Sequence, residues 1–224
     1  MSTTRGLPMT TTDVPSTASA TAQPATLRGA AIDRLHHLAY VTADTAATVA
    51  FYEGVLGMPL VHAIMGPEVP STKAPYPHIH TFFRLASGET LAFFESPDLH
   101  HQPPERRPGY EDFEHLAMAV DTRADVDQWR EYLEAQGLEV ITNDHGIIYS
   151  LYFRDPVNDI RLEITTTIDP TWSDRGTSAH QAVDDWTCTR DEAASAGNDV
   201  SEALRDLARN RRPGGDLTGN GQGR

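Results

Sequence analysis

Two histidines and one glutamate in this 224-residue chain have the types and positions of metal ligands. His37 and His115 each open a His-Leu-Ala tripeptide that is typical of the start of a β-strand. Glu163 lies in another apolar strand, between Leu162 and Ile164. A charged glutamate with apolar neighbours is costly to bury without a partner, and a cation is one such partner. Two imidazoles and one carboxylate on one side of a divalent ion suit Fe(II), Mn(II) or Zn(II), and leave coordination positions open for substrate or oxygen.

The elements that carry His37 follow a defined order. Residues 38–41 form a predicted strand, and the apolar spacing from Val49 to Leu56 predicts a helix that Gly57 ends. A strand over residues 60–64 follows. Residues 78–85 and 90–95 are then joined by an Ala-Ser-Gly turn as a hairpin. The order is β-α-β-β-β.

The same order returns after His115. A strand over residues 115–120 precedes a helix that Gly137 closes, and three strands follow. These strands are predicted at residues 138–142, 147–154 and 160–166. A repeat of about 78 residues is a stronger signal than any single motif. It predicts an α+β fold in which two βαβββ modules form one cupped mixed sheet, so that matching inward positions converge and bring His37, His115 and Glu163 together.

Composition divides the chain into three regions. Residues 1–30 are mainly Ser, Thr, Ala and Pro, which predicts a disordered leader because so few apolar side chains cannot offset the entropy of ordering. Residues 31–168 hold the repeats, at about 31–100 and 110–168. Residues 169–224 form a C-terminal tail in which Asn198 is expected to cap a short helix. That helix packs on the domain or on a neighbouring subunit, which leaves a homodimer open, or it is a marginal helix in a mobile tail.

Charge and cysteine content exclude several classes of protein. The formal net charge of -14 argues against nucleic acid or an anionic membrane as a partner, because both attract a basic face. There is no apolar run of about 18 residues, and the first 30 residues lack the apolar stretch of a secretory signal. The single cysteine, Cys188, excludes an intrachain disulfide and a cysteine-based zinc site. We therefore expect a soluble, acidic protein of the cytoplasm.

The repeats and their motifs resemble the vicinal oxygen chelate superfamily. This group includes glyoxalase I, fosfomycin-resistance enzymes, methylmalonyl-CoA epimerase, bleomycin-binding proteins and extradiol ring-cleavage dioxygenases. The resemblance rests on the two His-Leu-Ala strand starts, the helix end from Phe51 to Gly57 and the Asp155-Pro156 … Leu162-Glu163 ending. It implies that His37, His115 and Glu163 are ligands of one metal. Ala92 is the expected first-repeat counterpart of Glu163, so a fourth protein ligand is not expected.

A finer resemblance points to ring cleavage. Asn143-x-His145, Leu151-Tyr152, Asp155-Pro156 and Glu163 are similar to the extradiol dioxygenase signature. The resemblance implies that His145 and Tyr152 contact the metal-bound catecholate. Asn158 departs from the signature, which usually has Gly or Pro there. Glu89 stands where that family has its acid-base histidine, before Thr90.

His80 is our candidate for the missing base. In the hairpin, His80 pairs roughly with Phe94 and shares the strand parity of Ala92, so all three are expected on the same face. An imidazole with a pKa near neutrality could take a proton from a phenol. Apolar walls for an aromatic substrate could come from four aromatic side chains, namely Tyr40, Phe82, Phe94 and Tyr149.

The sequence therefore predicts a mononuclear metalloenzyme, most readily an Fe(II)-dependent dioxygenase that cleaves a catechol-like aromatic diol with O2; Mn(II) and Zn(II) remain alternatives. One rival is a metal-dependent lyase or isomerase of the glyoxalase or epimerase type, in which Glu89 or Glu95 would matter more than Tyr152. A second rival is a drug-binding protein without catalysis. The metal-ligand set argues against this second rival, because a pure binder does not need it.

Overall fold

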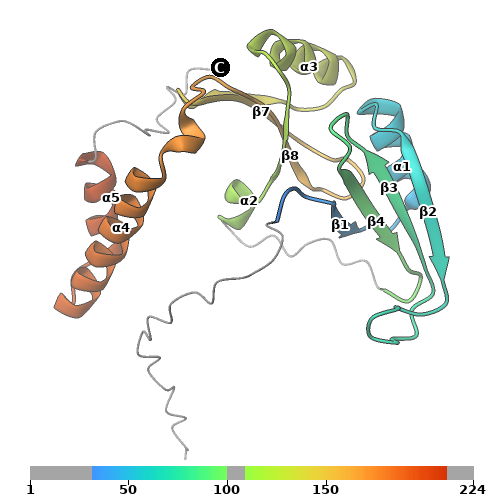
Figure 1. Ribbon diagram of the computed structural model, residues 1–224, viewed down its shortest axis with the longest axis horizontal. Coiled ribbons are helices and arrows are strands. Elements are labelled where there is room, and N and C mark those ends of the chain that lie inside the picture. The colour runs from blue at the N-terminus through green and yellow to red at the C-terminus, as the bar shows by residue number, and fades with distance from the viewer. Residues whose placement is uncertain (1–31, 100–108, 211–224) are drawn as a thin grey trace, which may run out of the picture. The chain divides into compact units, whose positions relative to one another are not determined.

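The computed structural model describes residues 32–99 and 109–210 (Figure 1). The predicted leader over residues 1–30 and the last part of the predicted tail, residues 211–224, lie outside the described residues.

The first repeat forms a four-stranded sheet with the strand order β1-β4-β3-β2. Its elements are β1 (His37–Val41), α1 (Thr45–Val49), the π-helix η1 (Ala50–Val55), β2 (Leu60–Gly66), β3 (His78–Arg84) and β4 (Thr90–Glu95). The β1–β4 pair is parallel, whereas β4–β3 and β3–β2 are antiparallel. This is the βαβββ module that the sequence predicts.

The second repeat has the same topology, with the strand order β5-β8-β7-β6. Its elements are α2 (Tyr110–Phe113), β5 (Leu116–Ala119), α3 (Arg123–Ala135), β6 (Ile141–Asp144), β7 (Ile148–Arg154) and β8 (Arg161–Thr167). Again the first and last strands pair in parallel and the others are antiparallel. The α+β class and the duplication are confirmed; the short helix α2 was not predicted.

Local sequence explains where the crossover helices begin and end. The Asp44 side chain accepts a hydrogen bond from the Ala47 amide at 2.9 Å, and Thr122 forms a capping box with Asp125. Gly57 and Gly137 follow the two helices with φ angles of 68° and 83°, which glycine adopts without the steric cost of a side chain. The two repeats thus use the same stop signal.

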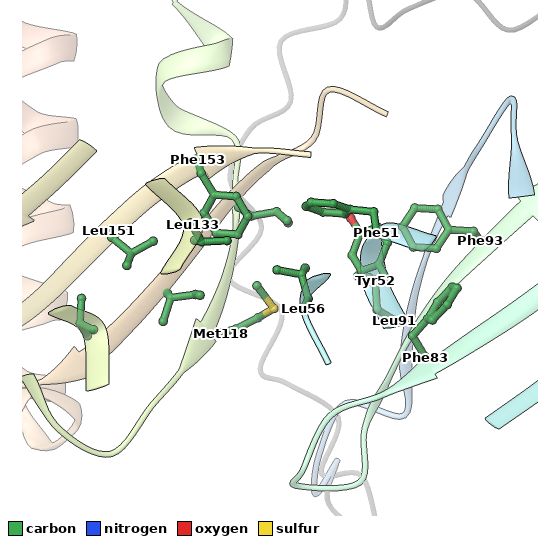
Figure 2. Close-up of a cluster of buried hydrophobic side chains, with 13 residues drawn as sticks. Phe51, Tyr52, Leu56, Phe83, Leu91, Phe93, Met118, Leu133, Leu151 and Phe153 are labelled. Carbon is green, nitrogen blue, oxygen red and sulfur yellow. The ribbon is translucent and has the colours of Figure 1, made fainter. Parts of the chain in front are cut away.

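Buried apolar side chains from both repeats form one core (Figure 2). In Figure 2 Phe51 and Tyr52 of η1, and Leu56 directly after it, lie between side chains of the first sheet and side chains of the second repeat. Phe93 of β4 and Leu151 of β7 are both fully buried in this core. The hydrophobic effect therefore holds both sheets and the first crossover helix together.

A buried polar network also links the repeats. The hydroxyl of Tyr52 in η1 donates to Asp155 Oδ2, in the turn after β7, at 2.9 Å. The same carboxylate accepts bonds from the Val157 amide at 2.7 Å and from the Asn158 side chain at 2.8 Å. Asn158 also donates to Thr48 of α1 at 3.4 Å. Burial and the Asp155 carboxylate raise the pKa of Tyr52 far above its usual value, so Tyr52 stays a proton donor.

The C-terminal region is more helical than predicted. After a short 3-10 turn, η2 (Trp172–Asp174), the 21-residue helix α4 (Gly176–Ala196) precedes α5 (Val200–Asn210), and these two helices contact each other. The helix α5 was expected, but Asp199 rather than Asn198 accepts the capping bond, from the Glu202 amide at 3.0 Å. The sequence analysis missed α4 because its apolar residues form only a weak stripe. No described helix combines the length and apolar character needed to span a membrane.

We predict that Tyr52→Phe destabilises the fold through the link to Asp155. The variant keeps the buried ring but removes one donor from a carboxylate that is 1% exposed. Losing a hydrogen bond to a charged group costs about 1.5–3 kcal/mol. Tyr132→Phe is the matched control, because the Tyr132 hydroxyl donates to the uncharged Val55 carbonyl at 3.1 Å on the surface. Urea unfolding at pH 7 measures both; equal losses of stability in the two variants would contradict the prediction.

Candidate metal centre

Strand pairing places four predicted site residues of the first repeat on one sheet face. His80 pairs with Phe94 and Phe82 with Ala92, while Val41 and Ala39 of β1 pair with Phe94 and Ala92. His37 lies two residues before Ala39 and therefore shares their face. The prediction that His80 and Phe94 lie on the face of Ala92 is confirmed by this register, and Phe82 lies on the same face.

His80 stands at the centre of that face. Its ring stacks on Phe94 with a centroid separation of 3.6 Å, and it also contacts Phe82 at 4.1 Å and His37 at 6.2 Å. Burial, with the nearby His37, His78 and His62, lowers the pKa of His80 to about 4. The Nε2 atom is buried and has no hydrogen-bond partner among the described residues. His80 is therefore neutral at physiological pH and has an acceptor or donor position to offer.

Two of the predicted pocket walls lie on the opposite faces of their strands. Tyr40 pairs with Phe93 in the register of β1 and β4 and contacts the Phe93 ring at 6.0 Å in the core, so it faces away from His37. Tyr149 lies an odd number of residues from Tyr152 and donates to Asp127 of α3 at 2.9 Å, so it faces the helix. Neither residue shares a face with the predicted ligands, and the expected walls reduce to Phe82 and Phe94.

In the second repeat, His115 and Glu163 come together directly. Their Nε2 and Oε2 atoms are 2.8 Å apart. Glu163 is only 2% exposed, and its carboxylate also accepts a hydrogen bond from the Tyr152 hydroxyl at 3.1 Å. Atoms that bind one metal at right angles are about 3 Å apart, given metal–ligand distances near 2.1 Å. The observed pair has the spacing of two ligands that share an ion.

The protons on His115 support that interpretation. Its Nδ1 atom lies 2.7 Å from the carbonyl oxygen of Phe113, which can only accept, so Nδ1 carries the hydrogen. In the neutral imidazole, Nε2 then presents a lone pair to the carboxylate of Glu163. Two acceptors at this distance repel each other unless a cation or a second proton lies between them. A backbone carbonyl on the outer nitrogen is also the usual support of a metal-binding histidine.

Tyr152 and His145 extend the pair into a hydrogen-bonded chain. The Tyr152 hydroxyl lies 3.0 Å from His145 Nε2, and the amide donor Asn143 Nδ2 lies 3.4 Å from His145 Nδ1. Because the single hydroxyl hydrogen of Tyr152 goes to Glu163, His145 must donate from Nε2. Burial and the charge of Glu163 raise the pKa of Tyr152, so the phenol is protonated at neutral pH. The structure therefore joins His145, Tyr152, Glu163 and His115.

The strand register explains why the first repeat has no matching carboxylate. Ala117 pairs with Glu163 in the second repeat, and Ala39 pairs with Ala92 in the first. Ala92 is thus the counterpart of Glu163, as predicted. Glu95 has another role: its Oε2 atom accepts a hydrogen bond from the Thr45 amide at 2.6 Å, at the start of α1.

The third predicted ligand is placed with His80 rather than with the pair. His37 Nδ1 lies 2.8 Å from His36 Nδ1, and the His37 ring contacts His80 and Phe82. Within residues 32–99 and 109–210, no group of three His, Cys, Asp or Glu side chains is close enough to hold one ion. The structure brings two of the three predicted ligands together, and the role of His37 stays a prediction.

Two cavities lie away from these residues. One of about 520 Å³ is lined by η1 and α3, including Gly57, Trp129 and Tyr132. The other, of about 420 Å³, lies beside Gly66 and His78. Neither is lined by His37, His115 or Glu163, so we do not assign the candidate metal centre to either cavity.

Comparison with known proteins gives one match to a family model and several to solved structures. The model of the Glyoxalase/Bleomycin resistance protein/Dioxygenase superfamily matches residues 34–164. No curated protein sequence matches the chain.

Three similar solved structures show the range of relatives. A glyoxylase/bleomycin resistance protein/dioxygenase domain from Frankia sp. EAN1pec is 19% identical, with a TM-score of 0.48 over 61% of this chain and 99% of that one. A fosfomycin resistance protein from Listeria monocytogenes, in complex with Mn(II) and a dihydroxypropylphosphonic acid, is 20% identical, with a TM-score of 0.46 over 65% and 98%. Lactoylglutathione lyase from Agrobacterium tumefaciens is 25% identical, with a TM-score of 0.41 over 59% and 92%.

We predict that His115→Ala and Glu163→Ala each abolish tight binding of a divalent ion. Each removes one of two donors that lie 2.8 Å apart, which leaves too few ligands for a stable complex. His37→Ala tests the third ligand, and His62→Ala is the control because His62 is exposed on the neighbouring strand β2. Elemental analysis of protein loaded with Mn(II) measures binding. Wild-type metal content in both the His115 and Glu163 variants would show that the site is misplaced.

A pH effect is expected at His80. Its pKa is about 4 in the folded protein and 6.5 when unperturbed, so the unfolded chain binds this proton more readily between those values. The free energy of unfolding therefore falls as pH drops from about 6.5 to about 4. In metal-free His80→Gln this dependence should be weaker, while His180→Gln, on the exposed surface of α4, should leave it unchanged. Urea midpoints between pH 4 and pH 7 provide the measurement, and identical slopes in wild type and His80→Gln would refute the assignment.

Proposed function

Because the chain belongs to the glyoxalase/bleomycin resistance protein/dioxygenase superfamily, we propose that it is a mononuclear metal-dependent dioxygenase that cleaves a catechol-like aromatic diol with O2. One observation carries the proposal: the buried Glu163 carboxylate lies 2.8 Å from His115 Nε2 on one side and accepts a hydrogen bond from Tyr152, which contacts His145, on the other. The first contact calls for a cation, and the second supplies polar hydrogens beside it.

The residues fit a divalent ion, with Fe(II) proposed and Mn(II) or Zn(II) as alternatives. Glu163 and His115 would hold it, with His37 as the proposed third ligand. A buried carboxylate without a cation is unfavourable, and the orientation of His115 already presents its free nitrogen to the site. Fe(II) or Mn(II), if bound, would supply Lewis-acid and redox chemistry to the two diol oxygens and to O2, whereas Zn(II) would supply Lewis-acid chemistry alone.

Tyr152 and His145 would act on the substrate oxygens. Both can donate hydrogen bonds at neutral pH, since the pKa of Tyr152 is raised and His145 carries its hydrogen on Nε2. Donors held in advance at the place where negative charge develops stabilise it without reorganisation. Asn143 Nδ2 can donate to Nδ1 of His145 at 3.4 Å and so orient the ring.

His80 would accept the proton of one hydroxyl. It is neutral, because its pKa is lowered to about 4, and its Nε2 atom is buried without a partner among the described residues. Phe94, which stacks on the His80 ring, and Phe82, which is tilted against that ring, offer an apolar surface to an aromatic substrate. The low pKa makes His80 a weak base, so its contribution depends on close placement of the hydroxyl.

The lyase or isomerase alternative is supported by fewer residues of the site. Glu95 is engaged by the amide of Thr45, and Ala92 offers no ligand at the position that matches Glu163. A drug-binding protein without chemistry would have no use for a paired His115 and buried Glu163. Ring cleavage uses the largest number of the polar groups that the second repeat brings together.

We predict that Tyr152→Phe lowers kcat about ten- to a hundredfold, since losing a hydrogen bond to a charged oxygen costs about 1.5–3 kcal/mol. His80→Gln should lose more, because general base catalysis contributes about 10²–10⁴-fold. Metal content should stay at the wild-type level in both. Tyr149→Phe is the matched control, because its hydroxyl bonds to Asp127 on the other face of β7. Steady-state assays on a panel of catechols after Fe(II) loading measure the effects.

Oxygen dependence separates ring cleavage from isomerisation. Under the proposal, Fe(II)-loaded protein consumes one O2 for each diol cleaved and stops when oxygen is removed. Oxygen-electrode and anaerobic assays on the same preparation test this. Turnover that continues unchanged without oxygen, together with loss of activity in Glu89→Gln, would replace ring cleavage by the lyase or isomerase alternative.

A further inference from the structure

We propose that Arg161 is a positioning residue for the metal centre, holding both neighbours of Glu163 in place. It lies two residues before Glu163 on β8 and therefore shares its face. Its guanidinium group lies over the Tyr152 ring at 4.6 Å from the centroid. One nitrogen of that group also donates to the carbonyl oxygens of Asp112 and Glu111 in α2.

The two contacts of Arg161 lead to the two partners of Glu163. Tyr152, which Arg161 covers, donates to one carboxylate oxygen at 3.1 Å. The segment α2, which Arg161 anchors, ends at Phe113, whose carbonyl oxygen binds His115 Nδ1 at 2.7 Å. His115 then meets the other carboxylate oxygen. One side chain thus fixes the ring plane of Tyr152 and the backbone that orients His115.

The strand pairing shows that the position of Arg161 has an energetic cost. Arg154 of β7 stands directly opposite Arg161 in the ladder, and like charges in such pairs are destabilising. Arg154 is compensated by carboxylates, at 3.4 Å from Asp159 and 3.9 Å from Glu111. Arg161 is compensated by the carbonyls of α2 and the face of Tyr152. A planar guanidinium can do both at once, whereas an ammonium group cannot.

A positioning role and a purely electrostatic role of Arg161 predict opposite effects of its removal on metal binding. A positive charge near a cation site weakens metal binding. If Arg161 acted through its charge alone, removing it would therefore strengthen metal binding. Removing a residue that orients His115 and Tyr152 would weaken it, by about ten- to a hundredfold for the outer support of a ligand. The sign of the change in affinity therefore decides between the two roles. This inference rests on the proposed metal site.

The experiment compares the Co(II) dissociation constants of wild type, Arg161→Ala, Arg161→Lys and Arg154→Ala, with the visible Co(II) spectrum as a report on ligand geometry. We expect Arg161→Ala to weaken binding about tenfold or more and to change the spectrum. Arg161→Lys should recover only part of the affinity. Arg154→Ala, which removes the opposing charge but no contact to Tyr152, should bind within about twofold of wild type. Tighter or unchanged binding in Arg161→Ala, or full recovery by lysine, would overturn the inference.

A second measurement does not depend on metal. In metal-free protein, hydrogen exchange of amides 110–116 should be several-fold faster in Arg161→Ala than in wild type, and unchanged in Arg123→Ala, whose ion pair with Asp144 joins α3 to β6. Thermal unfolding of each variant confirms that the fold is retained. If wild type binds no Co(II) but α2 loosens only in Arg161→Ala, the metal proposal fails and the positioning role stands. If α2 exchanges equally in all variants, the positioning role fails.

Discussion

The Asp155 carboxylate is the constraint on which the joining of the two repeats depends. It is fully buried, and it is satisfied only because Tyr52 of the first repeat donates to it while the amide and side chain of Asn158 close the turn around it. A buried charge without these donors would cost several kcal/mol. The network also includes Thr48 of α1, so the crossover helix of one repeat is tied to a turn of the other. The apolar core surrounds this link but is not directional; the hydrogen bonds fix the position.

Strand alternation places the core residues on one face of each sheet and the candidate site residues on the other. One face of the first sheet contributes Phe83, Leu91 and Phe93 to the core, and the other carries His37, His80, Phe82 and Phe94. In the second sheet, Leu151, Phe153 and Leu162 enter the core, whereas Tyr152, Arg161 and Glu163 share the other face. A duplicated module thus yields two polar faces of different chemistry, one rich in imidazoles and one with a buried carboxylate.

The Glu163 carboxylate shows how a site can be held in place by a few supporting contacts. Glu163 is buried, and its two oxygens meet side chains that are themselves held by other groups. The Phe113 carbonyl orients His115, His145 contacts Tyr152, and Arg161 touches both branches. Ligands whose outer atoms are already bonded lose little freedom when an ion binds, which is the physical reason for such supporting contacts.

The sequence by itself determined the duplication, the order of elements and the glycines that end the helices. It also determined that Ala92 and Glu163 occupy equivalent positions in the two repeats. These features follow from local periodicity and turn chemistry. It also identified His115, Glu163, Tyr152 and His145, which lie close together in one module. Tyr40 and Tyr149 could have been assigned to the core from their odd spacing to His37 and Tyr152. Only the tertiary structure decided the rest. The Glu95 side chain accepts a hydrogen bond from the Thr45 amide, the Asn158 side chain donates to Thr48 of α1, and Arg161 donates to carbonyl oxygens of α2. Each of these depends on contacts between segments far apart in the chain, and periodicity within one segment carries no information about such contacts.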